Sequence, residues 1–175
     1  MYNPTSEIVK KANKLVKSCG TRDPYRIAEN IGVEIMPCNF ERQRGAYKVI
    51  KRNRFIFINE NLQPAPKRIV LLHEIGHDVL HRAEAARAGG FKEFNIFNMA
   101  DSRMEYEANV FASQIELDDE EFLDYCSMGY DVQQIAMAMH SDINLIALKA
   151  DTLISRGYRL SRQEHRNDFL RYDKH

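Results

Sequence analysis

The sequence predicts an α+β fold in which a small antiparallel sheet packs on one apolar helix and a helical C-terminal part follows. Short runs with the alternation of β-strands are confined to residues 33–58. A continuous apolar run then surrounds residues 69–80, and capped segments with helical periodicity occupy residues 101–157. The chain has 175 residues, which is enough to bury an apolar core without disulfides.

Two helices are expected before the sheet. Asn3 can cap a helix that begins at Pro4, carries an apolar stripe and ends at Gly20. Asp23 and Pro24 repeat this start signal, and Gly32 ends the second helix. We interpret both helices as scaffold.

Three strands are expected next. Residues 33–36 alternate and end at Pro37, and residues 46–50 and 55–58 have the composition of strands. The Arg52-Asn53 pair suits a tight hairpin turn between the last two strands. We therefore expect the antiparallel sheet to precede the apolar helix.

The apolar helix carries the pattern His-Glu-x-x-His at residues 73–77 and is expected to begin beside Pro66. Four residues on a helix separate two side chains by about 6 Å along one face, so both imidazoles can reach one ion. A catalytic zinc ion binds imidazole nitrogens and keeps a position open for water. Glu74 is placed to accept a proton from that water. Gly76 predicts the close approach of a strand or of the substrate backbone, because glycine costs about 1 kcal/mol in a helix.

A catalytic zinc site needs a third protein ligand. His81 is a poor candidate, because it lies about 12 Å along a straight helix from His73 and the two cannot bind the same ion. We interpret His81 as a supporting or packing residue. Glu105, on the helix expected over residues 101–117, is our third ligand, and Asn109 one turn later can orient another ligand.

Two other interpretations of these carboxylates stay open. Residues 102–105 fit a capping box, in which Glu105 would bond only to the backbone at the start of its helix. Glu107 competes for the ligand role, but it points about 200° around the helix from Glu105. We expect only one of the two to face the zinc helix.

The chain is divided into a core at residues 1–117, a helical extension at 118–157 and a charged tail at 158–175. In the extension, residues 131–157 have the spacing of a helix-turn-helix, but their charges cancel and leave no phosphate-binding stripe. Packing or protein docking is therefore favoured over DNA binding. The tail is expected to be loosely attached. Residues 83–98 form either a mobile flap or a short helix with a loop, and we favour the flap.

Composition excludes several classes of protein. Twenty-five basic and twenty-five acidic residues leave no overall field to attract nucleic acid or a membrane. The three cysteines, without a Cys-x-x-Cys pair, fit reduced thiols in a cytoplasm. No signal peptide and no stretch approaching 18 apolar residues is present, so we expect a soluble, cytoplasmic protein.

The residues from His73 to His81, together with those from Glu105 to Ala112, resemble the ImmA/IrrE family of small metallopeptidases. The resemblance covers roughly residues 5–157. It implies a zincin-like fold, a zinc ion held by His73, His77 and Glu105, and Glu74 as general base. It also implies a protein substrate, typically a helix-turn-helix repressor encoded beside the peptidase on a phage or integrative element, so that cleavage acts against repression. Residues 113–119 depart from the apolar stretch usual in the family. This departure affects the expected wall of the cleft, and hence the substrate preference, rather than the metal site.

The expected mechanism is metal-assisted hydrolysis, in which Glu74 passes the water proton to the leaving amine and the edge of the hairpin holds an extended substrate. The candidates for the donor that stabilises the oxyanion are Tyr106, His140, His81 and Tyr47, and the sequence does not choose among them. The alternative function is a non-proteolytic regulator that binds a repressor or DNA through residues 131–157.

Overall fold

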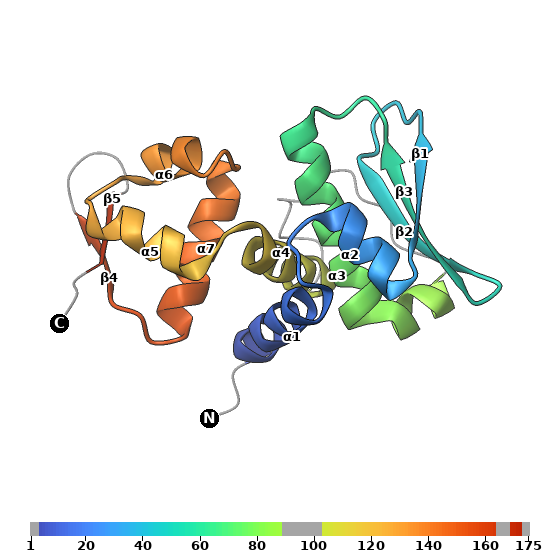
Figure 1. Ribbon diagram of the computed structural model, residues 1–175, viewed down its shortest axis with the longest axis horizontal. Helices are drawn as coiled ribbons and strands as arrows, with labels where there is room; N and C mark the ends of the chain where they lie inside the picture. Colours follow the sequence, from blue (N-terminus) through green and yellow to red (C-terminus); the bar gives the residue numbers. More distant parts are fainter. Residues whose placement is uncertain (1–3, 89–102, 164–168, 173–175) are drawn as a thin grey trace.

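The computed structural model describes residues 4–88, 103–163 and 169–172. A three-stranded sheet, helix α3, helix α4 and then further helices succeed one another across the molecule (Figure 1). The α+β fold is therefore confirmed. The first half contains α1 (Pro4–Cys19), α2 (Pro24–Ile31), β1 (Glu34–Cys38), β2 (Gly45–Ile50), β3 (Asn53–Asn59) and α3 (Pro64–Ala88). The second half contains α4 (Arg103–Glu116), α5 (Asp119–Ser127), α6 (Val132–Ala138), α7 (Ile143–Ser155), β4 (Leu160–Gln163) and β5 (Phe169–Tyr172).

The first two helices begin and end where the capping residues predict. Helix α1 begins at Pro4, and Gly20 follows it with a φ of 65°. Asp23 caps α2 by accepting a hydrogen bond from the backbone N–H of Arg26, and Gly32 closes the helix in the left-handed conformation. Asn3 lies outside the described residues.

The sheet is mixed rather than antiparallel throughout. Its strand order is β1-β3-β2; β2 pairs antiparallel with β3 as expected, but β1 pairs parallel with β3. The reason is that β3 lies between the other two strands, so the connection from β1 crosses to the far edge before the hairpin returns. Strand β1 also continues through Pro37, which an edge strand tolerates because one side of its backbone needs no ladder partner. The hairpin turns at Lys51 and Arg52, both with positive φ, rather than at Arg52-Asn53.

Helix α3 is longer than predicted at both ends. It begins at Pro64, so that Pro66 lies in the first turn. Backbone N–H groups of the first turn have no intrahelical acceptor, so a proline there loses no hydrogen bond. It continues through a kink at His81 (φ −129°, ψ 22°) to Ala88. Residues 83–88 are thus helical rather than part of a flap, and residues 89–98 lie outside the described residues.

Helices α3 and α4 approach closely at Gly76. A Cβ atom at this position would lie 3.2 Å from both Cα and the carbonyl oxygen of Ala108. The close neighbour is therefore the backbone of α4, and not the strand or substrate that the glycine suggested. This contact brings His73 and Glu105 within reach of one another.

The helical extension is joined to the rest by a continuous apolar core and by a buried charge network. The fully buried ammonium of Lys149 in α7 donates to Gln114 Oε1 and to the carbonyl oxygen of Leu117, both at 2.8 Å, and pairs with Asp119. Asp119 also accepts from Arg156 at 2.7 Å. The expected boundary between residues 117 and 118 falls at the α4–α5 connection and stays a prediction.

The expected loose attachment of the C-terminal tail stays a prediction. Strands β4 and β5 form an antiparallel hairpin beside α5 and α7 (Figure 1). Within the described part of the chain, no helix combines the length and apolar content that crossing a bilayer requires.

Candidate metal centre

The structure brings together three of the side chains singled out in the sequence. His73 and His77 project from α3, and Glu105 projects from the first turn of α4. The Nε2 atoms of the two histidines lie 3.0 Å apart, and the Glu105 carboxylate lies 3.1 Å from His73 Nε2 and 3.4 Å from His77 Nε2. Three ligand atoms of the types that bind divalent metals therefore converge on one point.

The local environment favours the protonation states that a metal ion needs. Burial lowers the pKa of His77 to about 4, so its imidazole is neutral at neutral pH. Burial alone would raise the pKa of Glu105, but hydrogen bonds with His73 and His77 outweigh it and hold the pKa below its ordinary value. A neutral imidazole and an ionised carboxylate are the forms that bind metals.

Each histidine of the cluster has a polar neighbour behind it. The Oδ1 atom of Asn109 lies 2.8 Å from His73 Nδ1, as the spacing in α4 predicted for a residue that orients a ligand. On the other side, His77 Nδ1 lies 3.3 Å from His81 Nδ1, and His81 Nε2 lies 3.0 Å from Glu107. His81 is therefore outside the three-residue cluster but in contact with it.

Both carboxylates of α4 reach α3, which corrects the expectation that only one would. Glu105 meets His73 and His77, whereas Glu107 meets His81 beyond the kink in α3. The kink changes the direction of α3, so a second face of α4 also contacts it. Ser102, the start of the alternative capping box, lies outside the described residues, and both Glu105 oxygens lie near imidazoles.

Glu74 is fully buried between α3 and strand β2. Its carboxylate lies against the backbone of Gly45, where an added Cβ atom would be 2.8 Å from Glu74 Oε1. The same Cβ atom would lie 2.7 Å from a methyl group of Val70. Gly45 thus leaves the space that the Glu74 side chain occupies.

The four candidate oxyanion donors differ in their burial and in their contacts. Tyr47 is fully buried and donates its hydroxyl hydrogen to Asp78 at 2.6 Å. His81 is engaged with His77 and Glu107, as described above. Tyr106, one residue after Glu105, is partly buried, and His140 is exposed. Tyr106 and His140 remain as candidates.

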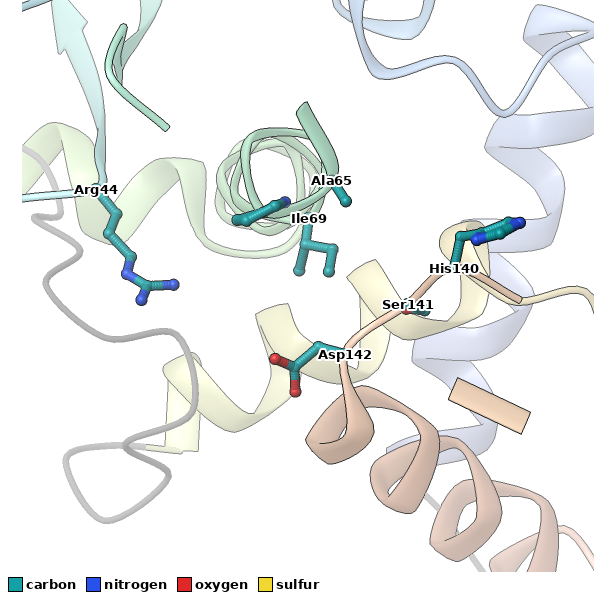
Figure 2. Close-up of a pocket in the computed structure, with 7 residues that line it drawn as sticks. Arg44, Ala65, Ile69, His140, Ser141 and Asp142 are labelled. Atoms are coloured by element: carbon teal, nitrogen blue, oxygen red, sulfur yellow. The ribbon is translucent and has the colours of Figure 1, made fainter. Parts of the chain in front are cut away.

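A cavity of about 210 Å³ lies beside the N-terminal turns of α3. Figure 2 shows the side chains of Arg44, Ile69 and Asp142 extending towards this space from three sides. Ile69 is four residues before His73, so the cavity lies about one helical turn from the cluster. Its lining residues are Arg44, Ala65, Pro66, Ile69, His140, Ser141 and Asp142.

Some of these contacts have only a weak local signal in the sequence. His81 follows His77 by one helical turn, which signals a neighbour on the same face. Gly45 and the pairing of Glu107 with His81 had no local signal, because both depend on how distant segments pack.

Comparison with known proteins identifies one matching family and similar phage and bacterial proteins. The sequence model of the IrrE N-terminal-like domain, a peptidase family, matches residues 28–141. The chain is 33% identical over 147 residues to uncharacterized immunity region protein 2 of Bacillus phage phi105, covering 83% of this chain and 90% of the relative. It is 32% identical over 138 residues to metallopeptidase ImmA of Bacillus subtilis strain 168, covering 75% of this chain and 78% of the relative.

Proposed function

Because the chain belongs to the ImmA/IrrE family of metallopeptidases, we propose that it is a zinc-dependent endopeptidase that cleaves a helix-turn-helix repressor. The observation that carries the proposal is the cluster of His73, His77 and Glu105, whose ligand atoms meet across two helices. In this proposal these three residues are the protein ligands. Glu74 is the general base.

The spacing of the cluster supports zinc. Ligand atoms at 2.0–2.1 Å from a tetrahedral ion are about 3.3 Å from each other. The three distances here are 3.0, 3.1 and 3.4 Å. Two histidines and a glutamate also leave a fourth position for water or substrate, as in catalytic rather than structural sites. When bound, the ion lowers the pKa of water and polarises the scissile carbonyl group.

The residues of the chain supply the remaining steps. Glu74 accepts a proton from the attacking water and returns it to the amine that leaves as the C–N bond breaks. Its burial keeps bulk water away from the carboxylate and strengthens its interaction with the proton. Tyr106 or His140 is the donor to the oxyanion.

The sheet offers a place for the substrate backbone. Strand β2 lies at an edge of the sheet and, among the described strands, pairs with β3 alone. Because β2 also packs on α3, an extended peptide added along this edge would run beside the helix that carries His73 and Glu74. The cavity between Arg44 and Asp142 is placed to receive one of its side chains.

The names of the relatives support the class of substrate. One relative is an immunity region protein of a phage, and the other is a metallopeptidase named ImmA. In an immunity region, the repressor is the protein that, once cleaved, would change gene expression. A repressor substrate would also imply that this peptidase acts in the cytoplasm. The helical extension, residues 118–157, is the proposed docking part for it.

The test uses the purified full chain and the repressor encoded nearest to its gene. Glu74→Gln should retain zinc, measured by elemental analysis, and should lose cleavage by at least about 100-fold, because general base catalysis contributes 10²–10⁴-fold. Glu84→Gln, an exposed carboxylate on the same helix, is the matched control and should cleave normally. Retained cleavage by Glu74→Gln would remove Glu74 from its role. Binding of the repressor without cleavage by the wild type would favour a non-proteolytic regulator.

A further inference from the structure

A line of three polar side chains leads away from the metal centre. His77 Nδ1 lies 3.3 Å from His81 Nδ1, and His81 Nε2 lies 3.0 Å from Glu107 Oε2. His77 and His81 are 1% and 5% exposed, and the Glu107 side chain is 16% exposed. The line therefore runs from the buried cluster to a carboxylate near the surface.

Hydrogen-bond chemistry gives this line a direction. A neutral imidazole has one N–H donor and one nitrogen acceptor. If His77 uses Nε2 as a metal ligand, its proton is on Nδ1, which faces His81 Nδ1 at 3.3 Å and can donate to it. The proton of His81 is then on Nε2, where it is donated to the Glu107 carboxylate. Each step is consistent with the next, and a carboxylate, which only accepts, ends the line.

We infer that His81 and Glu107 are positioning residues that fix the tautomer and the ring orientation of His77 for metal binding. The inference rests on the proposed metal site, since it assigns Nε2 of His77 as the ligand atom. Asn109 plays the equivalent part for His73, because its Oδ1 atom accepts from His73 Nδ1. Both ligand histidines are thus held from behind by residues outside the ligand set.

Two observations favour this role over simple packing. The Glu107 carboxylate also accepts from Arg103, one turn earlier in α4, which keeps it ionised and in place. The kink in α3 falls at His81 itself, so the ring that contacts His77 lies where the direction of the helix changes. A packing residue would not need a carboxylate on its far nitrogen.

The test measures metal affinity rather than peptidase activity. Zn²⁺ is titrated into the full chain in competition with a chromophoric chelator, and Co²⁺ provides a visible absorption spectrum of the site. His81→Phe keeps an aromatic ring but removes both nitrogens, and it should weaken Zn²⁺ binding by about 10–100-fold. Glu107→Gln keeps an acceptor without its charge and should weaken binding several-fold. Both variants should change the Co²⁺ spectrum.

The double variant separates positioning from packing. Glu107 acts through His81, so adding Glu107→Gln to His81→Phe should cost little further affinity. The matched control is Glu116→Gln, which removes another ion pair between α4 and α3, the one with Arg68 at 2.6 Å, without touching a histidine. It should leave Zn²⁺ affinity unchanged.

Several results would overturn the inference. Wild-type affinity in His81→Phe, additive losses in the double variant, or an equal loss in Glu116→Gln would each do so. If His81→Phe does not fold, the comparison of Glu107→Gln with Glu116→Gln decides alone. Failure of the wild type to bind Zn²⁺ would instead remove the proposed metal site together with this inference.

Discussion

The backbone of Gly45 in β2 lies against the carboxylate of Glu74 in α3. A Cβ atom on residue 45 would be only 2.8 Å from Glu74 Oε1 and 2.7 Å from Val70 Cγ1, distances that side chains do not adopt. The position of the proposed base thus depends on the absence of a side chain on the neighbouring strand. Gly45 has no positive φ, so its role is to leave space rather than to adopt an unusual backbone conformation.

Gly45→Ala should therefore displace Glu74 without removing any functional group. We expect kcat/KM to fall by at least about tenfold, because small misplacements of reacting groups have large effects on rate. The zinc content should stay at the wild-type value, since the added methyl group meets Glu74 and Val70 and not the ligand cluster. Peptide cleavage and elemental analysis of the same preparation measure both quantities.

Gly157→Ala is the control for a general loss of stability. Gly157 has a φ of 97°, and among the described residues no atom lies within 4 Å of its Cβ position, so alanine strains the backbone there without a steric clash. It should lower the melting temperature while kcat/KM stays at the wild-type value. Full activity in Gly45→Ala would show that the Glu74 carboxylate can move without consequence.

Gly76→Ala should weaken metal binding through the distance between two helices. The new methyl group would meet the backbone of Ala108 at 3.2 Å, so α4 must move by a few tenths of an ångström away from α3. That movement separates Glu105 from His73 and His77. We expect about tenfold weaker Zn²⁺ binding in chelator competition.

In Gly76→Ala the free energy of unfolding of the metal-free chain should change less than the free energy of Zn²⁺ binding. Alanine is favoured over glycine in a helix by about 1 kcal/mol, which opposes the cost of the tighter contact. Chemical denaturation of the metal-free chain measures the net effect of these two opposing contributions on the free energy of unfolding. Unchanged affinity together with unchanged stability would contradict the tight packing at Gly76.

Capping residues and periodicity predicted most of the fold because they act locally. Asp23, Asp118 and Asp131 each cap the helix that follows them, and the capping hydrogen bonds that they accept come from backbone N–H groups within three residues. Strand pairing was less predictable, because no local signal shows that β3 lies between β1 and β2. The continuation of α3 to Ala88 was missed because the apolar pattern weakens after the kink at His81.

The residues of the site likewise divide into those that local spacing predicts and those that depend on tertiary packing. The spacing of His73, Glu74 and His77 is a property of one helix, and it singled out these residues without tertiary information. The pairing of His81 with Glu107 depends on the crossing of α3 and α4, and the place of Gly45 depends on the packing of β2 on α3. Both relationships join residues that are more than twenty positions apart, so spacing within one segment could not reveal them.

The buried ammonium of Lys149 predicts a pH dependence of stability. Burial lowers the pKa of Lys149 to about 8, below its ordinary value of 10.5. Between these two pH values the unfolded chain binds a proton that the folded chain does not, so raising the pH favours the folded state. The free energy of unfolding of the wild type relative to Lys149→Met should therefore rise by up to about 3 kcal/mol between pH 8 and 10.5. Urea denaturation across this range measures it, and a constant difference would contradict the lowered pKa.

Tyr47→Phe should destabilise the fold without affecting catalysis, although the sequence made Tyr47 a candidate oxyanion donor. The Tyr47 hydroxyl is buried and donates to Asp78, whose carboxylate also pairs with Arg54 at 2.9 Å and Arg82 at 3.0 Å.

Removing the hydroxyl leaves Asp78 with its two arginines, so we expect a loss of about 1–2 kcal/mol in the free energy of unfolding. The value of kcat should match that of the wild type below the new melting temperature. Tyr106→Phe and His140→Ala provide the comparison, because one of them should lower kcat by about 10²–10³-fold if it removes the oxyanion donor. A loss of kcat in Tyr47→Phe at unchanged stability would instead place the Tyr47 hydroxyl in the cleft, contrary to its contact with Asp78.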